Sequence, residues 1–151
     1  FDFVYNGEKA LESLKKLNHF QTTFQFERDK VKLPDLKSYF KLYSCNVTGL
    51  KHYLFSYLET EMKINEEVFL VRQPKNEFDK HAIALFIDYN DGCETYQEQI
   101  GYISQNENYM LSKLLDQQYE LKAFLTKIND KELDNKSYNF ALELTIYMKK
   151  Q

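Results

Sequence analysis

The chain has 151 residues, 43% of them hydrophobic and 28% charged, which suits one domain with a sizeable core. Four Gly and two Pro exclude a linker-like or disordered composition, and a net charge of −3 excludes the broad basic surface that duplex DNA or an acidic membrane attracts. No apolar run approaches the roughly 20 residues that cross a bilayer, and no signal-peptide pattern is present, so we expect a cytoplasmic, intracellular protein with no membrane partner.

The cysteines and histidines show no ligand spacing. Cys45 and Cys93 belong to no CxxC pair, which excludes a zinc ribbon and argues against a disulfide framework. His19, His52 and His81 are scattered, so we predict no metal site. The four glycines are isolated and cannot form a phosphate-cradling loop or a dinucleotide fingerprint, and we predict no cofactor.

The first half of the chain predicts one helix followed by strands. Apolar residues recur at helical spacing over Asn6–Asn18, and phenylalanines alternate with polar residues over Phe20–Phe26, the period of a strand with one buried face. The segment Tyr39–Thr48 alternates again and reaches Gly49, where a strand can turn. A short helix or loop is expected over Leu50–Met62.

The middle of the chain predicts three further strands. The apolar runs Val68–Val71 and Ala82–Ile87 are joined by a polar connection that opens with the turn signal Gln73–Asn76. A loop at Tyr89–Gly92 then leads to a strand over Gln99–Ile103.

The last third predicts a helix and two strands. Apolar residues share one helix face over Asn108–Asp116, and a strand follows over Glu120–Ile128. The polar run Asn129–Lys136 precedes a last alternating strand, Tyr138–Met148. The fold class is therefore α+β and mainly β, a curled sheet or small barrel with one or two packed helices and an N-terminal helix-strand extension.

Three segments carry a family resemblance. LVRQPKNEFDKHAIAL at Leu70–Leu85, VTGLKHY at Val47–Tyr53 and QIGYI at Gln99–Ile103 together resemble the signature of the HIRAN domain family over residues 45–128. The resemblance implies an OB-like or SH3-like β-barrel. Residues 1–44 would then be an extension packed on the barrel, and residues 129–151 would supply a strand that completes the domain.

The resemblance also implies a DNA-binding module that grips the 3′-hydroxyl end of single-stranded DNA in DNA repair or remodelling, with a helicase or nuclease on a separate chain as an expected partner. It places DNA contacts at six positions, which are Lys51, His52, Asn76, Phe78, Asp79 and Tyr102. The rings of His52, Phe78 and Tyr102 would stack on bases, at about 1–3 kcal/mol per base. No catalytic residue is implied.

The remaining three positions have polar roles in this interpretation. Lys51 would pair with a phosphate, and Asn76 can donate and accept hydrogen bonds at a base edge. Asp79 would accept a hydrogen bond from a 3′-hydroxyl and repel a terminal phosphate. Gln73 departs from the family pattern, which has an acidic residue after the arginine.

Structural roles compete with these functional ones. Phe78 could fill the barrel interior, Asp79 could cap its own turn, and Arg72 could pair with a nearby carboxylate. Asp35 and the run Glu61–Lys63 superficially resemble a metal-dependent nuclease core, although such short motifs arise by chance in a charged chain.

Two function classes stay open at this stage. Residues 45–128 hold eight Lys/Arg against thirteen Asp/Glu, a net charge of −5, so any DNA contact there must be local rather than an extended basic groove. The alternative is a protein-interaction or structural module that keeps the barrel without DNA binding.

Overall fold

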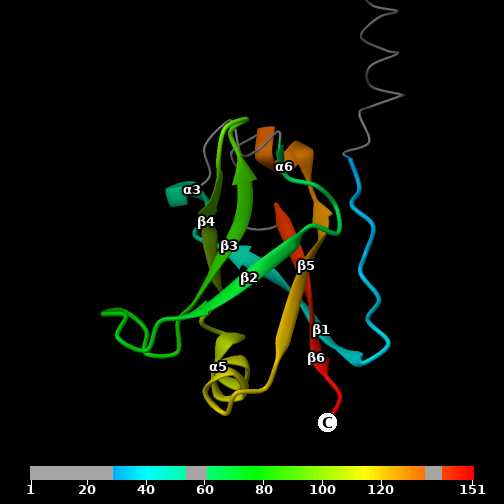
Figure 1. The fold of residues 1–151 in the computed structure, drawn as a ribbon. Helices are drawn as coiled ribbons and strands as arrows, with labels where there is room; N and C mark the ends of the chain where they lie inside the picture. The colour runs from blue at the N-terminus through cyan, green and yellow to red at the C-terminus, as the bar shows by residue number, and fades with distance from the viewer. Residues whose placement is uncertain (1–28, 54–60, 135–140) are drawn as a thin grey trace, which may run out of the picture.

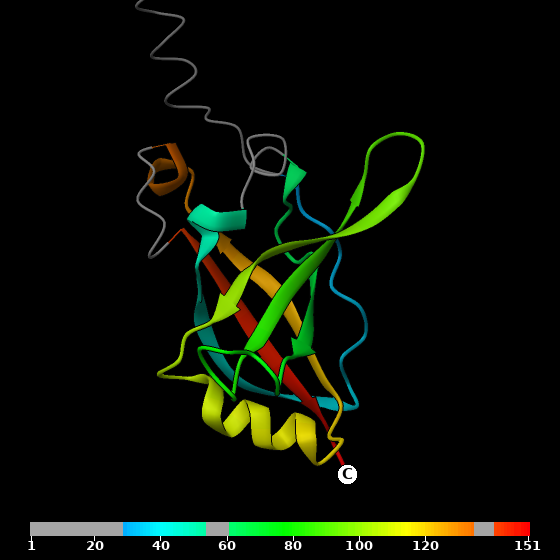
Figure 2. The ribbon, with the colours of Figure 1, turned by 90° about the vertical axis from the view of Figure 1, so that its left-hand side faces the viewer.

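The computed structural model describes residues 29–53, 61–134 and 141–151, whose strands close into an antiparallel barrel (Figure 1). Helices α3 and α6 lie near one end of this barrel, and α5 covers the other (Figures 1 and 2). The predicted helix Asn6–Asn18 and strand Phe20–Phe26 lie outside the described residues. In chain order the described elements are β1 (Tyr39–Thr48), α3 (Leu50–Tyr53), β2 (Glu67–Arg72), β3 (Ile83–Asn90), β4 (Thr95–Ile103), α5 (Asn108–Asp116), β5 (Leu121–Ile128), α6 (Asp130–Asp134) and β6 (Leu142–Lys149).

The strands follow the order β1-β4-β3-β2-β5-β6 around the barrel, and each neighbouring pair is antiparallel. The ring closes where β1 pairs with both β6 and β4, so the barrel extends from residue 39 to residue 149. Register shifts interrupt the β1–β6, β3–β4 and β5–β6 pairings, with the extra residue in β1, β4 and β5, and such bulges bend strands enough to close a small barrel. The predicted mainly β barrel fold is confirmed.

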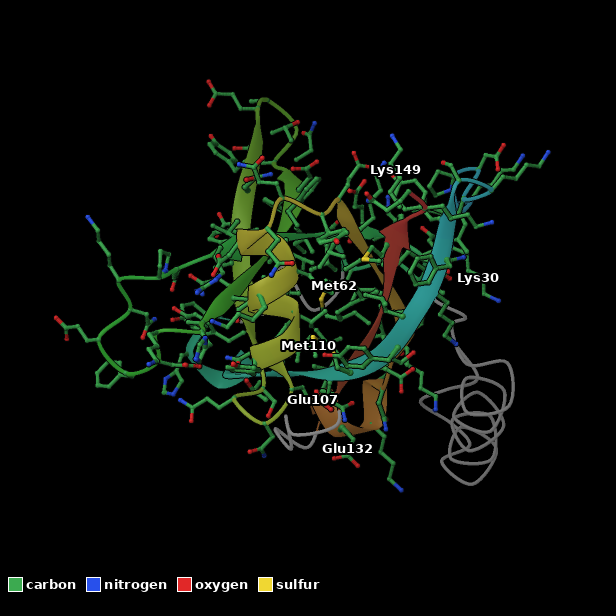
Figure 3. All side chains as sticks on the ribbon, turned by 90° about the horizontal axis from the view of Figure 1, so that it is seen from below. Lys30, Met62, Glu107, Met110, Glu132 and Lys149 are labelled. Carbon is green, nitrogen blue, oxygen red and sulfur yellow. The ribbon has the colours of Figure 1, made fainter. Side chains whose placement is uncertain are left out.

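Alternation within the strands builds the core. Alternate residues of β3 up to Ile87 and of β6 up to Ile146 face the interior and are fully buried, namely Ile83, Leu85, Ile87, Leu142, Leu144 and Ile146. From α5, Leu111 joins the same core, which closes the barrel end beneath that helix. Seen along the barrel, α5 crosses this end and Met62 lies inside the ring of strands (Figure 3).

Two predicted elements have the bounds that the sequence gives them, the strand Tyr39–Thr48 and the helix Asn108–Asp116. The predicted loop at Tyr89–Gly92 is displaced by two residues, because β3 continues to Asn90 and the turn covers residues 91–94. The β4 strand that pairs with β3 begins at Thr95 rather than at Gln99. These strand ends form a ribbon that projects from the barrel (Figure 2). A projecting ribbon buries no apolar face, so its residues carry no alternating pattern.

The polar stretch after β5 also differs from expectation, because it contains helix α6. Asn129 Oδ1 accepts the backbone N–H of Glu132 at 3.2 Å, as an N-cap does, and Leu133 anchors the short helix in the core. One buried leucine gives too little periodicity to predict a helix. The last strand is observed from Leu142, and its predicted start at Tyr138 lies outside the described residues.

Residues 29–38 run along the outside of the barrel before β1 begins (Figure 1). Backbone hydrogen bonds tie them to the segment before β2, from Val31 N–H to Ile64 O at 2.9 Å and from Ile64 N–H to Asp29 O at 3.1 Å. This part of the chain therefore packs on the barrel by main-chain pairing.

Candidate nucleic-acid interface

The loop between β2 and β3 is shaped by one side chain. Asn76 Oδ1 accepts two backbone N–H groups, from Phe78 at 2.9 Å and from Asp79 at 3.1 Å. Both lone pairs of the amide oxygen are then in use, so Asn76 keeps no acceptor for a base edge. The loop fixed in this way holds Phe78 in solvent, with 88% of the residue exposed, and the alternative that Phe78 fills the barrel is wrong.

Asp79 joins this loop to the start of α5. Its Oδ1 accepts the backbone N–H of His81 at 2.9 Å, and its Oδ2 accepts the side-chain Nδ2–H of the buried Asn108 at 2.6 Å. The turn-capping role of Asp79 is confirmed. Each carboxylate oxygen has a second lone pair, so the same group can still accept a hydrogen bond from a ligand.

The opposite wall consists of two tyrosines from α3 and β4. The rings of Tyr53 and Tyr102 meet edge to face, with centroids 6.0 Å apart, and a hydrogen bond with Tyr102 raises the pKa of Tyr53. Gly49 has φ of +77°, a left-handed turn that favours glycine, and this turn leads the chain from β1 into the short helix that carries Tyr53.

Gln73 links the two walls. Its Oε1 accepts the hydroxyl hydrogen of Tyr102 at 3.0 Å and the Nδ2–H of Asn76 at 3.1 Å. A glutamine here serves as one neutral acceptor for both donors. The position that departs from the family pattern therefore orients the tyrosine ring and the loop together.

These groups surround a hollow of about 380 Å³ at the rim of the barrel, a volume within the range of about 300–1,000 Å³ that small-ligand sites have. Its walls combine aromatic faces with a carboxylate and a few polar groups. The lining residues are Thr48, Tyr53, Asn76, Phe78, Asp79, Ala82, Tyr102, Ile103 and Gln105. Such a set can stack planar rings and accept a hydrogen bond from a hydroxyl group.

Four of the six predicted contact residues line this hollow, and they are Asn76, Phe78, Asp79 and Tyr102. His52 is exposed on α3 and does not belong to the lining, although its ring touches that of Tyr53 edge to face at 6.4 Å. Lys51 also belongs to α3, and its side chain lies outside the described part of the structure.

Tyr53 is a lining residue that the sequence reasoning missed. The motif VTGLKHY suggests His52 as the ring after the basic position, one residue too early. A helical turn begins after Gly49, as the hydrogen bond from His52 N–H to Gly49 O shows, and each residue of such a turn rotates by about 100°. A helix or loop is expected here, but neither expectation says which ring of the segment faces the hollow, and the motif alone indicates His52.

The guanidinium of Arg72 bonds to other groups of the protein through all three of its nitrogens. Its Nε and Nη2 donate to the two carboxylate oxygens of Asp116 at 3.0 and 3.2 Å, and its Nη1 donates to the carbonyl oxygen of Ala82. The predicted structural ion pair is confirmed. Cations beside the hollow are instead the exposed Lys75 and Lys80 of the loop.

Other classes of site find no support in the described residues. Over residues 29–53, 61–134 and 141–151, no three His, Cys, Asp or Glu side chains come together as a metal site. Asp35 of the nuclease-like pattern accepts a hydrogen bond from the N–H of Lys37, and Glu61 is exposed. No helix within these described ranges is long and apolar enough to cross a membrane.

A closed antiparallel barrel with an aromatic hollow at its rim defines a small OB-like binding module. A model of the HIRAN domain matches residues 40–149, which is more than half of the chain, and the protein belongs to this family. HIRAN domains are DNA-binding modules rather than catalytic ones. The match is wider than the 45–128 segment that the motifs indicate, because β1 and β6 complete the barrel.

Two crystal structures share the fold. One is a protein from Lactobacillus plantarum, with a TM-score of 0.58 and 20% identity, covering 75% of this chain and 97% of that one. The other is the HIRAN domain of human HLTF, with a TM-score of 0.52 and 20% identity, covering 76% of this chain and 82% of that one. No curated protein sequence matches the chain.

Proposed function

We propose that the hollow binds the 3′-hydroxyl end of single-stranded DNA. The observation that carries the proposal is the exposed ring of Phe78, held in solvent by a loop with its own hydrogen bonds. A large apolar side chain fixed in water beside a hollow gains nothing for the fold, and such exposure is typical of binding sites. Membership of a DNA-binding family supports the same function.

Stacking supplies the sequence-independent part of binding in this proposal. Phe78 offers an open ring face, and Tyr102 offers a ring whose hydroxyl is already bonded to Gln73. A base stacked on an aromatic ring contributes about 1–3 kcal/mol whatever its identity. Lys51 and His52 remain predicted contacts, the lysine for a phosphate and the histidine for a second ring face.

Asp79 supplies the end recognition. Its carboxylate faces the hollow and is held from both sides by His81 and Asn108, so its position costs little to fix when a ligand arrives. A 3′-hydroxyl can donate to it, whereas a 3′-phosphate brings like charges together.

The test is a fluorescence anisotropy titration with oligonucleotides that differ only in a 3′-hydroxyl or a 3′-phosphate. We expect the phosphate end to bind worse by at least about 1.5–3 kcal/mol, because a charged hydrogen bond is lost and repulsion is added. Asp79→Asn should largely remove this preference. It keeps an oxygen for His81, and Asn108 can turn its amide over to accept the new N–H.

Two further variants separate the contributions. Phe78→Ala should weaken both oligonucleotides alike, because stacking does not depend on the terminal group. Glu77→Gln removes an exposed carboxylate from the same loop and should leave the end preference intact, which controls for long-range charge. An end preference that persists in Asp79→Asn, with the melting temperature unchanged, would reduce Asp79 to its turn-capping role.

The second candidate is a protein-interaction or structural module that keeps the barrel without DNA binding. The net charge of −5 over residues 45–128 favours it, since phosphates are repelled at long range. Failure of the folded wild-type protein to bind either oligonucleotide would support this candidate. Participation in DNA repair or remodelling, a helicase or nuclease partner on another chain, and a cytoplasmic location all stay predictions of the first proposal.

A further inference from the structure

Helix α5 carries an exposed aromatic ring next to the hollow. Asn108, its first residue, donates to Asp79, and the next residue is Tyr109, with 57% of its surface exposed. Figures 1 and 2 both show the β2–β3 loop beside this helix at the same end of the barrel. Tyr109 therefore directly follows a residue, Asn108, that bonds to Asp79 of the proposed 3′-end site.

The ring of Tyr109 is held in place by its neighbours. It meets the ring of His81 edge to face, with centroids 4.9 Å apart and planes at 74°. Ser112 Oγ donates to the carbonyl oxygen of Tyr109 at 2.7 Å and lies 3.3 Å from His81 Nδ1. Tyr109 remains 57% exposed beside this edge-to-face contact, so ring surface is left free for a ligand.

A cation stands beside the same ring. Lys113 Nζ is 5.3 Å from the ring centroid of Tyr109, and the two residues are one helical turn apart. Lys113, Lys75 and Lys80 are exposed on α5 and on the adjoining loop. The same two elements also carry the carboxylates of Glu77, Asp79 and Asp116, of which Asp116 is paired with Arg72. The positive charge here is therefore that of single lysines that can each reach one phosphate.

We propose that Tyr109 and Lys113 form a second nucleotide site, which binds the part of the strand on the 5′ side of the nucleotides in the hollow. A base stacks on Tyr109, and Lys113 exchanges its place over the ring for the neighbouring phosphate. The pairing of a ring face with a cation matches the repeat of a nucleic-acid strand, in which a planar base and a phosphate alternate. Because the 3′ end of the strand stops at Asp79, any further nucleotides that the protein contacts must lie on its 5′ side. The inference rests on the proposed function and extends it to a longer footprint.

The test compares a dinucleotide with a hexanucleotide, both with a 3′-hydroxyl, by anisotropy or calorimetry on the whole chain. The wild-type protein should bind the hexanucleotide more tightly. Tyr109→Ala should weaken hexanucleotide binding by about 5- to 150-fold, the range for one lost stacked base, and leave dinucleotide binding unchanged. Tyr109→Phe should restore the hexanucleotide affinity, because the ring is retained.

A matched control variant and the salt dependence of binding test the roles of Tyr109 and Lys113 separately. Tyr96 is another exposed tyrosine, on the ribbon away from the hollow, and Tyr96→Ala should change neither affinity. Lys113→Gln should reduce the log–log salt slope of hexanucleotide binding by about 0.7, the value for one phosphate on a single strand.

The possible failures are distinguishable. Binding of the dinucleotide with an unchanged hexanucleotide affinity in Tyr109→Ala overturns the second site and leaves the hollow standing. An equal loss for both lengths overturns it too, because Tyr109 would then act through the hollow. Binding of neither oligonucleotide by the folded wild-type protein overturns both proposals.

Discussion

At the scale of single residues, the proposed function gives structural and ligand-binding roles to different side chains of the loop after β2. Asn76 uses its oxygen on the backbone and one N–H on Gln73, so it shapes the loop. Phe78 makes no such contribution, and in the proposal its exposed ring contacts the ligand. Asp79 can have both roles, because a carboxylate has more lone pairs than its two protein donors use.

A substitution at Asn76 tests this division. Asn76→Ala leaves the N–H groups of Phe78 and Asp79 without their acceptor, so we expect a loss of roughly 0.5–1.5 kcal/mol in unfolding free energy and weaker binding of both oligonucleotide ends. Asn76→Asp keeps the acceptor for both N–H groups, although it gives up the Nδ2–H bond to Gln73, and should retain most of the stability. Denaturant unfolding and anisotropy measure the two effects. A stability loss in Asn76→Asp as large as in Asn76→Ala would contradict the loop-shaping role of the Asn76 oxygen.

Glu66, just before β2, provides a test by pH. Burial raises its pKa above the ordinary value of 4.5, and the carboxylates of Asp88 and Glu61 add to the shift, which Lys63 opposes. The folded state thus keeps a proton that the unfolded chain releases first, so stability falls as the pH rises from 4.5 through the folded-state pKa.

The isosteric variant Glu66→Gln removes this loss. We expect it to melt at a higher temperature than the wild-type protein at pH 7, and the difference should shrink as the pH is lowered towards 4.5. Thermal unfolding at several pH values measures it. A wild-type advantage at pH 7 would mean that the charged form of Glu66 is stabilised in the fold.

The site residues differ in how far the sequence predicts them. Phe78 and Asp79 follow from an ordered motif within one loop, where local turn chemistry fixes their positions. Tyr53 does not, because its place depends on whether four residues after Gly49 turn as a helix. The role of Gln73 depends on a partner 29 residues away, which no local pattern reveals.

At the scale of elements, the pairing of β1 with β4 depends on a close approach of two backbones. Their pairing is short, with Val47 opposite Ile103 and Thr48 opposite Tyr102, and it closes the barrel. Gly101 lies in this pairing with φ of +153°, and a Cβ there would collide with the carbonyl oxygen of Thr48 and stand 2.9 Å from Val47 Cγ1. A glycine lets two backbones approach where a side chain would separate them.

Gly101→Ala should therefore destabilise the protein by about 1–3 kcal/mol, the usual cost of overpacking, or more where backbone must move. Gly92→Ala is the control, since nothing lies within 4 Å of its added Cβ and only its positive φ is strained. Melting temperatures compare them, and about 1 kcal/mol corresponds to roughly 2–4 °C for a chain of this size. Equal losses in the two variants would contradict the steric argument at the β1–β4 pairing.

Elements with a buried face were the predictable ones. The strand Tyr39–Thr48 and the helix Asn108–Asp116 place one side in the core, so their apolar residues repeat with the right period. The ribbon formed by the ends of β3 and β4 and the short helix α6 bury little, and their turns are held by backbone N–H groups that donate to Asn and Asp side chains. Such bonds leave only a polar stretch in the sequence, which reads as a loop.

At the scale of the whole molecule, charge limits how the module meets DNA. Residues 45–128 carry a net charge of −5, and the guanidinium of Arg72 is paired with the carboxylate of Asp116. Positive charge near the hollow comes from single exposed lysines on the β2–β3 loop and on α5. Long-range attraction is then weak, and in the proposed function short-range stacking and end recognition supply most of the binding free energy.

The salt dependence of binding follows from this distribution. Each phosphate neutralised on a single strand contributes about −0.7 to the slope of log K against log salt concentration. One or two contacts, made by lysines at the rim and on α5, give an expected slope near −1 to −2. Titrations of a 3′-hydroxyl hexanucleotide at several salt concentrations measure it. A slope steeper than about −4 would require an extended basic track, which contradicts binding by stacking at a single strand end.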